Sequence, residues 1–298
     1  MSVIKTFSFP SANQWLLNFR IRLGQWVLGD IGSVADNNKV GAKSGRVFLV
    51  GAGPGDPGLL TVHALRAIQS ADVVLIDYLV SDEIVALIPQ RAEQRYVGKR
   101  AGHHSMSQAA ICDLMADYAL QGKVVVRLKG GDPSIFGRTA EEANVLEQNG
   151  IDYAVVPGIT SASAASAYTG IPLTLRDHAQ SVRLMTAHMR DPDKMPDWTQ
   201  LVRSLKGETL VFYMGLNRLS EIVSQMCAVG MPANMPIAVV DKASTPEQQT
   251  CVGTAQTIVD QVESMKLSGP SLIVIGEAVS HQYSLSPELL TTLSICGS

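Results

Sequence analysis

From Arg46 onward, short apolar runs alternate with longer segments in which apolar residues recur at helical spacing. Short β-branched runs are typical of buried strands, and a repeat near 3.6 residues is typical of amphipathic helices. This alternation predicts parallel βαβ units and an open sheet. The predicted strands are Val47–Val50, Val73–Ile76, Val124–Leu128 and Tyr153–Val156, and the predicted helices are Leu59–Ser70, Ile84–Ile88, Ser107–Leu120 and Ala140–Asn149.

A second series of alternating segments begins near Asp177. The pattern predicts strands at Val182–Thr186, Leu210–Tyr213, Ile237–Val240 and Leu272–Ile275, with helices at Leu219–Val229 and Thr254–Met265. The fold class is therefore α/β, with two α/β domains. We place the domain boundary in the loop Leu175–Gln180, which gives an N-terminal domain at 45–176 and a C-terminal domain at 177–298.

Residues 1–44 differ from the rest of the chain. They contain Trp15 and Trp26, two of the three tryptophans, and several apolar residues fall on one side at helical spacing. The polar stretch Asp36–Gly45 is typical of a linker. We interpret 1–44 as an extension that packs on the main domain or on a partner subunit; a helix on a membrane surface is the weaker alternative.

Composition narrows the function classes. The formal net charge of -3 favours neither nucleic acid nor an acidic membrane as a partner. The four cysteines show no CxxC spacing and no cluster with histidines, so we expect no metal and no disulfide framework. No apolar run is long enough to span a bilayer, and the N-terminus lacks the order of a signal peptide, so we expect a cytosolic protein.

Glycine or proline follows several of the predicted strands. These turns are Gly51–Gly58, Lys129–Pro133, Pro157–Ser161 and Met214-Gly215. Ligands of open α/β sheets bind beyond the carboxyl ends of strands, and glycine lets a backbone approach a ligand closely. A single such turn is more often structural, because strand-to-helix turns need glycine anyway. Four of them favour one shared ligand-binding cleft.

The first turn also satisfies the G-x-G-x-x-G pattern of dinucleotide-binding proteins, with Asp77 after the second strand. Pro54 and Pro57 argue against that function, because they lack the N–H groups that a pyrophosphate needs. Asp56 would also place negative charge beside the phosphates. The turn better suits a ligand without phosphates.

Basic residues are concentrated between Arg91 and Arg138, a segment that contains eight arginines and lysines but only four acidic residues. Such a segment is either a solvated face or a cleft for a polyanionic small molecule, in which arginine forks bind carboxylates. The neighbouring His103 and His104 make a poor metal chelate, so contact with substrate or simple exposure is the better interpretation.

Taken together, these segments resemble the tetrapyrrole methylase superfamily, and in particular its uroporphyrinogen-III C-methyltransferase branch. The similarity spans roughly residues 46–280, and its order and number of motifs make it specific. The motifs are Val50–Thr61, Asp77–Ser81, Gly98–Arg100, His104-Ser105, Arg127–Pro133, Phe136–Arg138, Val156–Ala162, Gly170–Thr174 and Phe212–Gly215. Two positions depart from the family pattern: Thr139-Ala140 replace two glycines, and Ile76 replaces a tyrosine.

The resemblance implies two α/β domains with a cleft between them, a homodimer, and S-adenosyl-L-methionine as methyl donor with S-adenosyl-L-homocysteine as product. By resemblance, Asp77 is the proton acceptor and Lys99 the proton donor. The implied cofactor contacts are Pro54, Gly130, Gly131, Asp132, Ile135, Thr160, Ser161, Met214 and Ala243. The resemblance and the basic segment together imply substrate contacts at Arg100, His104, Arg127, Lys129 and Arg138.

The expected reaction is methylation of uroporphyrinogen III at C-2 and then C-7, which gives precorrin-2 for sirohaem, cobalamin or haem d1. A later precorrin methyltransferase is the nearest alternative, although Arg127–Pro133 favours the uroporphyrinogen branch. A ribosomal RNA methylase would need a broad basic face. A nucleotide-dependent oxidoreductase rests only on the G-x-G-x-x-G pattern, and a non-catalytic binding module would not need Asp77 together with Lys99.

Overall fold

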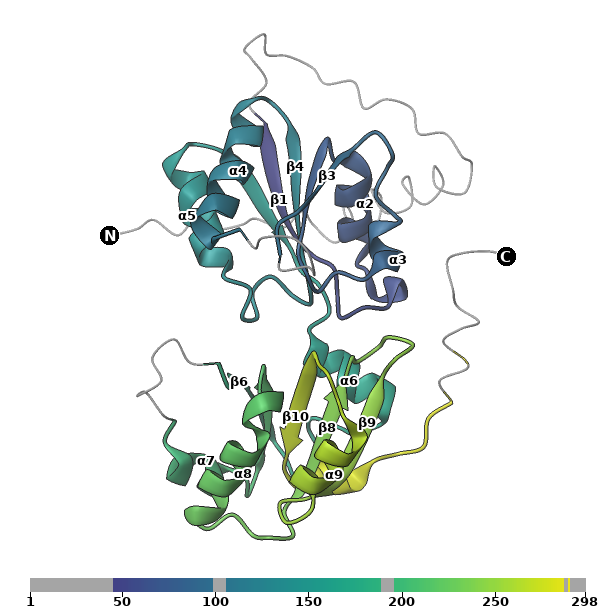
Figure 1. The fold of residues 1–298 in the computed structure, drawn as a ribbon, viewed down its shortest axis with the longest axis vertical. Coiled ribbons are helices and arrows are strands. Elements are labelled where there is room, and N and C mark those ends of the chain that lie inside the picture. Colours follow the sequence, from purple (N-terminus) through teal and green to yellow (C-terminus); the bar gives the residue numbers. More distant parts are fainter. Residues whose placement is uncertain (1–44, 99–105, 189–195, 287–288, 290–298) are drawn as a thin grey trace, which may run out of the picture. The chain divides into compact units, whose positions relative to one another are not determined.

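In the computed structural model, residues 45–98, 106–188, 196–286 and 289 are described (Figure 1). The predicted extension at 1–44 therefore lies outside the described residues. Within the described residues, the chain forms two five-stranded sheets, which we call the first and the second sheet. The predicted α/β class is confirmed.

The first sheet is entirely parallel and has the strand order β3-β2-β4-β1-β5. Its central strands are short and apolar, as expected for strands that helices cover on both faces. The elements of this half are β1 (Arg46–Gly51), α2 (Val62–Ser70), β2 (Val73–Ile76), α3 (Asp82–Val85), β3 (Glu93–Tyr96), α4 (Gln108–Leu120), β4 (Val124–Lys129), α5 (Thr139–Gln148) and β5 (Asp152–Val156), with a 3₁₀ turn at Pro57–Leu59.

Alternate residues of the first sheet pack against different helices. Val50, Val74 and Ile76 join the core cluster of α2 and α3, whereas Leu49 and Leu75 join that of α4. Two side-chain caps begin α2 and α4: Thr61 Oγ1 accepts the Ala64 N–H, and Ser107 Oγ accepts the Ala110 N–H.

The second sheet is mixed, with the order β6-β7-β10-β8-β9. β6 and β7 are parallel, whereas β10 is antiparallel to both of its neighbours and β9 is antiparallel to β8. The elements are α6 (Ser161–Thr169), β6 (Ser181–Thr186), α7 (Trp198–Ser204), β7 (Glu208–Tyr213), α8 (Leu219–Ala228), β8 (Pro236–Asp241), β9 (Gln249–Thr254), α9 (Ile258–Met265) and β10 (Ser271–Ile275), with 3₁₀ turns at Leu216–Arg218 and Glu277–His281.

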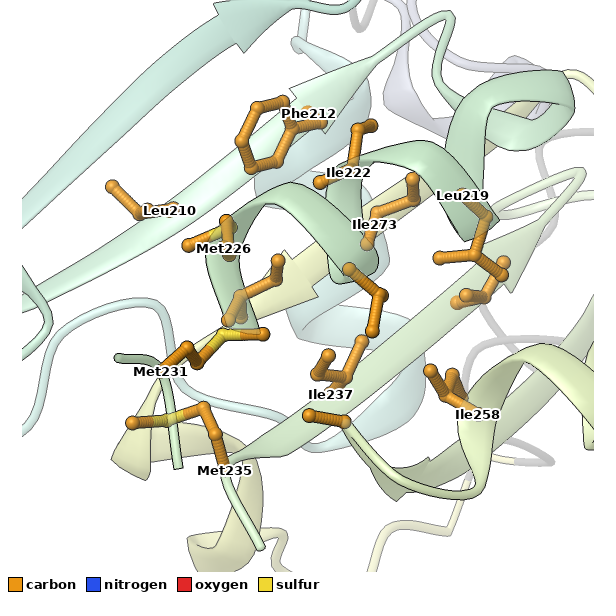
Figure 2. Close-up of a cluster of buried hydrophobic side chains, with 14 of the residues drawn as sticks. Leu210, Phe212, Leu219, Ile222, Met226, Met231, Met235, Ile237, Ile258 and Ile273 are labelled. Atoms are coloured by element: carbon orange, nitrogen blue, oxygen red, sulfur yellow. The ribbon is translucent and has the colours of Figure 1, made fainter. Parts of the chain in front are cut away.

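An apolar core holds the helices of this half against the second sheet. Phe212 and Ile273 of the sheet pack with Ile222 and Met226 of α8 and with Ile258 of α9 (Figure 2). On the opposite face, small residues of α6 pack against β7, β8 and β10. Among the described residues, no helix is both long and apolar enough to cross a membrane.

The pattern analysis missed four elements. The side chains of β3 are all exposed, and β3 and β9 are edge strands with polar residues, so neither forms an apolar run. Helix α6 is rich in alanine and serine and has only a weak apolar face. Helix α7 is short. The domain limits 45–176 and 177–298 stay predictions.

Candidate functional site

Three of the predicted glycine turns lie together at the carboxyl edge of the first sheet. Beyond β1 and β4, Gly53 and Gly131 exchange backbone hydrogen bonds of 3.1 and 2.7 Å, and the Ala52 N–H donates to the Lys129 carbonyl at 2.7 Å. The turn after β5 joins them at Gly158, where an added Cβ would lie 2.4 Å from the Gly131 carbonyl oxygen. Glycine is therefore required at this close approach.

The Gly130-Gly131-Asp132 turn is held rigidly but leaves its backbone accessible. The Asp132 carboxylate accepts the Ser134 N–H at 2.8 Å and the Gly158 N–H at 3.0 Å, which fastens two of the turns to each other. Gly131 has a φ of 68°, and within 4 Å an added Cβ there would meet only Ser161 Oγ, at 3.9 Å. This open backbone beside Ser161 fits the close approach of a ligand to two predicted cofactor contacts.

Several backbone N–H groups of the first turn are already hydrogen-bonded to other groups of the protein. The N–H of Gly58 donates to Asp56 Oδ1 at 2.7 Å, that of Asp56 to Ser244 Oγ at 3.5 Å, and that of Gly53 to Gly131. The hydroxyl of Tyr168 donates to Asp56 Oδ2, and the pKa of Tyr168 is raised by burial and by this carboxylate. These contacts support the sequence argument that the turn is no cradle for a pyrophosphate.

Tyr213, at the end of β7, is hydrogen-bonded to the predicted cofactor contact Thr160 and directly precedes another, Met214. Its hydroxyl lies 2.6 Å from Thr160 Oγ1 and accepts the Ala162 N–H at 3.1 Å, at the start of α6. Its ring packs on Phe136 with 5.0 Å between centroids. Burial raises the pKa of Tyr213, so its hydroxyl stays protonated at neutral pH. Met214 follows directly and is 54% exposed with a φ of 57°.

The other predicted cofactor contacts lie in turns. Ala243 is buried between Lys242 and Ser244, whose φ values are 48° and 62°. The buried Asp241 supports this turn, because its carboxylate accepts the Gly269 N–H at 2.8 Å and the Ser271 hydroxyl. Pro54 and Ile135 are partly exposed in the turns after β1 and β4.

Asp77, the predicted proton acceptor, directly follows β2 at the same edge of the first sheet. Its N–H donates to the Leu128 carbonyl at 2.9 Å, and its Oδ1 accepts the Tyr78 N–H at 2.9 Å. Its side chain is 35% exposed, and Oδ2 lies 3.5 Å from Arg127 Nη2. Lys99, Arg100 and His104 lie outside the described residues, so their distances from Asp77 are not defined.

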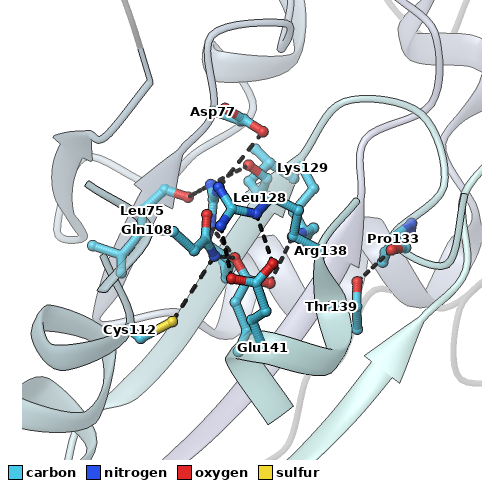
Figure 3. A network of polar contacts seen from close by, with 12 residues as sticks. Leu75, Asp77, Gln108, Cys112, Leu128, Lys129, Pro133, Arg138, Thr139 and Glu141 are labelled. Atoms are coloured by element: carbon cyan, nitrogen blue, oxygen red, sulfur yellow. Dashed lines mark hydrogen bonds and ion pairs between the residues drawn. The ribbon is translucent and has the colours of Figure 1, made fainter. Parts of the chain in front are cut away.

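Arg127 and Lys129, predicted to bind substrate, are instead directed into the protein. Both are 3% exposed, and both pair with the fully buried Glu142 of α5: Arg127 Nε at 3.0 Å and Lys129 Nζ at 2.6 Å (Figure 3). Burial lowers the pKa of Lys129, although Glu142 opposes that shift. These contacts give the two cations an internal role, and nothing in them supports an anchor for substrate carboxylates.

Among the described members of the predicted substrate set, Arg138 is the exposed one. It pairs with Glu141 through two hydrogen bonds of 2.8 and 2.7 Å. Its backbone is left-handed, with a φ of 57°, as is that of Phe136 at 55°. The basic segment is therefore partly neutralised by two glutamates that lie just beyond its end, Glu141 and Glu142.

Comparison with known proteins decides the family. The family model of the Tetrapyrrole (Corrin/Porphyrin) Methylases matches residues 46–259. The chain belongs to this family. The motif-based assignment is therefore confirmed.

Relatives and solved structures agree with that assignment. This tetrapyrrole methylase is 51% identical over 239 residues to a siroheme synthase of Acinetobacter baylyi, covering 80% of this chain and 52% of the relative. It is 47% identical over 243 residues to the siroheme synthase of Vesicomyosocius okutanii, again covering 52% of the relative. The chain thus spans about half the length of these curated relatives.

Among solved structures, uroporphyrin-III C-methyltransferase from Thermus thermophilus, complexed with S-adenosyl homocysteine, superposes with a TM-score of 0.67 at 36% identity. The match covers 79% of this chain and 99% of that one. A cobalt precorrin-4 methyltransferase of cobalamin biosynthesis superposes with a TM-score of 0.71 at 30% identity, covering 83% and 99%. These matches confirm the two-domain α/β fold and support the class of S-adenosylmethionine-dependent C-methyltransferases.

Sequence reasoning missed three residues that shape the site of this methylase. Glu142 lies four residues after Arg138, just outside the basic segment. Its place in the predicted helix Ala140–Asn149 was the available signal that it could pack against the sheet. Tyr213 lies in the family motif Phe212–Gly215, but only its neighbour Met214 was assigned a role. Asp56 was considered only as an argument against a phosphate ligand, whereas it caps its own turn and binds Tyr168. In the described part of the chain, no three potential metal ligands lie together.

Proposed function

We propose that this methylase transfers methyl groups from S-adenosyl-L-methionine to uroporphyrinogen III, first at C-2 and then at C-7, to give precorrin-2. The observation that carries the proposal is the meeting of three family glycine turns with Asp77 at one edge of the first sheet. The 36%-identical structural neighbour, a uroporphyrin-III C-methyltransferase, supports the substrate, and its bound S-adenosyl homocysteine supports the methyl donor.

The residues proposed for the donor site suit the chemistry of the methyl donor. The open backbone of Gly131 beside Ser161 and the exposed Met214 offer polar backbone and apolar contacts to an uncharged adenosine and a sulfonium. We assign donor binding to the predicted set of Pro54, Gly130, Gly131, Asp132, Ile135, Thr160, Ser161, Met214 and Ala243. In this assignment Asp132 and Thr160 also support the site indirectly, because their side chains are hydrogen-bonded to Gly158 and Tyr213.

When bound, the donor supplies an already activated methyl group. The protein then has to align the pyrrole carbon with that methyl and to accept the proton that the macrocycle loses. Positioning of this kind is worth about 7–11 kcal/mol in favourable cases. Asp77 is our candidate for the proton acceptor, because its carboxylate is the partly exposed one at the end of β2. We retain Lys99 as proton donor, and Arg100, His104 and Arg138 as contacts for substrate carboxylates.

The deciding experiment is incubation of the purified chain with uroporphyrinogen III and S-adenosyl-L-methionine, followed by mass spectrometry. We expect two added methyl groups and the absorbance of precorrin-2 after the first, singly methylated product has formed. The matched variant is Asp77→Asn, which keeps the volume of the side chain. It should retain binding of S-adenosyl-L-homocysteine by calorimetry and lose turnover by about 100-fold or more. Unchanged turnover would remove Asp77 from the mechanism.

A later precorrin methyltransferase is the second candidate, favoured by the similarity to cobalt precorrin-4 methyltransferase. A substrate panel that compares uroporphyrinogen III with precorrin intermediates separates the two. Methylation of a later intermediate alone would replace our proposal. The predicted homodimer and cytosolic location are part of the proposal, and sedimentation of the purified chain tests the first of them.

A further inference from the structure

Four charged side chains form a chain of ion pairs between α5 and the carboxyl edge of the first sheet. Glu142 binds Lys129 and Arg127, and Arg127 reaches Asp77 at 3.5 Å (Figure 3). The two carboxylates balance the two cations. Gln108 of α4 adds an amide donor, 3.3 Å from Glu142 Oε1. Charges that are buried without such pairing cost several kcal/mol each, so this network has to stay intact in the folded protein.

The guanidinium of Arg127 is held by three acceptors, which bind two of its three nitrogens. Nε donates to Glu142 at 3.0 Å, while Nη1 donates to the carbonyl of Leu128 at 3.2 Å and more weakly to that of Leu75 at 3.4 Å. A guanidinium is planar and rigid, so these contacts also determine the direction in which Nη2 points. Nη2 points toward Oδ2 of Asp77. Glu142 and two strands of the sheet therefore control the contact with Asp77.

Exposure separates the roles within this network. The side chains of Arg127, Lys129 and Glu142 are exposed by 4%, 3% and 0%, whereas that of Asp77 is exposed by 35%. Of the four, Asp77 is the group that a ligand at this edge can reach. Arg127 can influence such a ligand through the carboxylate that it holds.

We infer that Arg127 is a positioning residue, held by Glu142, which orients the Asp77 carboxylate toward the substrate, and that it is not a contact for substrate carboxylates. This inference rests on the proposed function, because it assigns a purpose to Asp77 in the reaction. It replaces the direct substrate role that the basic segment suggested for Arg127.

The test compares four forms of the full-length chain: wild type, Arg127→Gln, Arg127→Lys and Arg183→Gln. The control, Arg183, is an ion-paired arginine of the second sheet, 2.9 Å from Glu208. Values of kcat and KM are measured with uroporphyrinogen III, and crystal structures of wild type and Arg127→Gln show the position of the Asp77 carboxylate. Thermal unfolding reports the stability of each variant separately.

We expect Arg127→Gln to lower kcat by about tenfold and to leave KM within about twofold, because a misplaced catalytic group costs rate more than binding. Its Asp77 carboxylate should turn away from the wild-type position. Arg127→Lys keeps a positive charge for Glu142 but lacks the forked guanidinium, so its kcat should lie between those of wild type and Arg127→Gln. Arg183→Gln should match wild type in both constants.

Two results would overturn the inference: a raised KM with unchanged kcat, which marks a substrate anchor, or an Asp77 carboxylate that stays in place in Arg127→Gln. If Arg127→Gln does not fold, the same two criteria apply to Arg127→Lys. A wild-type chain that methylates nothing would refute the proposed function instead, and the position of Asp77 in the variants would still test the positioning role.

Discussion

The two sheets of this methylase differ in how their buried charges are bound: those at the first sheet pair with one another, whereas Asp241 of the second accepts hydrogen bonds from neutral donors. The first sheet carries a network of paired charges, in which Glu142 is 0% exposed and Arg127 and Lys129 are each 3% exposed. In the second sheet, the side of the core beneath α7, α8 and α9 consists of apolar side chains such as Phe212, Ile273 and Met226 (Figure 2). Both sheets are five-stranded, so size alone does not explain the difference.

The comparison shows where each sheet contributes to function. Buried charges cost desolvation and give little net stability, so their presence in the first sheet favours a role in the reaction. We propose that the second sheet contributes through the ends of its strands, where Met214, Lys242 and Ser244 adopt left-handed backbones. An apolar core is well suited to hold such turns in place.

The largest effect on stability should come from the apolar side of the comparison. Phe212→Ala leaves a cavity in a fully packed core and should lower the free energy of unfolding by about 4 kcal/mol. Met214→Ala, two residues away and exposed, is the matched control and should leave that free energy nearly unchanged. Urea denaturation of both variants measures the contrast, and equal losses would show that the second core is not the rigid support described here.

The next largest effect concerns the charged side. Glu142→Gln leaves Arg127 and Lys129 without their buried counter-ion and should cost about 3 kcal/mol of unfolding free energy. The adjacent Glu141→Gln removes an exposed partner of Arg138 and should cost much less. Chemical denaturation at neutral pH compares the two. Similar values for neighbouring glutamates would contradict the role of burial.

A smaller effect is expected at the hydrogen bonds between β7 and the start of α6. Tyr213→Phe removes the hydroxyl that binds Thr160 and the Ala162 N–H and should cost about 1 kcal/mol. Affinity for S-adenosyl-L-homocysteine should fall as well, because Thr160 is a predicted cofactor contact. Calorimetry of the variant tests this second effect. An unchanged affinity would limit Tyr213 to a structural role.

The smallest effect is a pH dependence that belongs to Lys129. Burial lowers its pKa below the ordinary value of 10.5, so between the two values the unfolded chain binds more protons than the folded one. Stability from this group therefore rises with pH toward 10.5 and is lost as pH falls through the folded value. Lys129→Met should abolish this component in denaturation curves recorded over that range, whereas a component of the same size in the variant would assign it to other groups.

Local patterns predicted most of the strands and helices with apolar or capped sequences. Val73–Ile76 has the predicted bounds, and the predicted helix Ser107–Leu120 is α4, with Ser107 as its cap. The edge strands β3 and β9 were missed because edge residues face solvent and need no apolar run. The mixed direction of the second sheet could not be predicted either, because strand periodicity does not encode the direction of pairing.

The sequence by itself determined the α/β class, the family and the position of each glycine turn, because these depend on local pattern and on motifs of fixed spacing. Only the tertiary structure decided which charged side chains are buried and which stay exposed. Arg127 and Lys129 are indistinguishable from exposed basic residues in the sequence, and they are buried because α5 places Glu142 against β4. The physical reason is that ion pairing and burial depend on residues that helix packing brings together, and the charge of one segment does not record its partners.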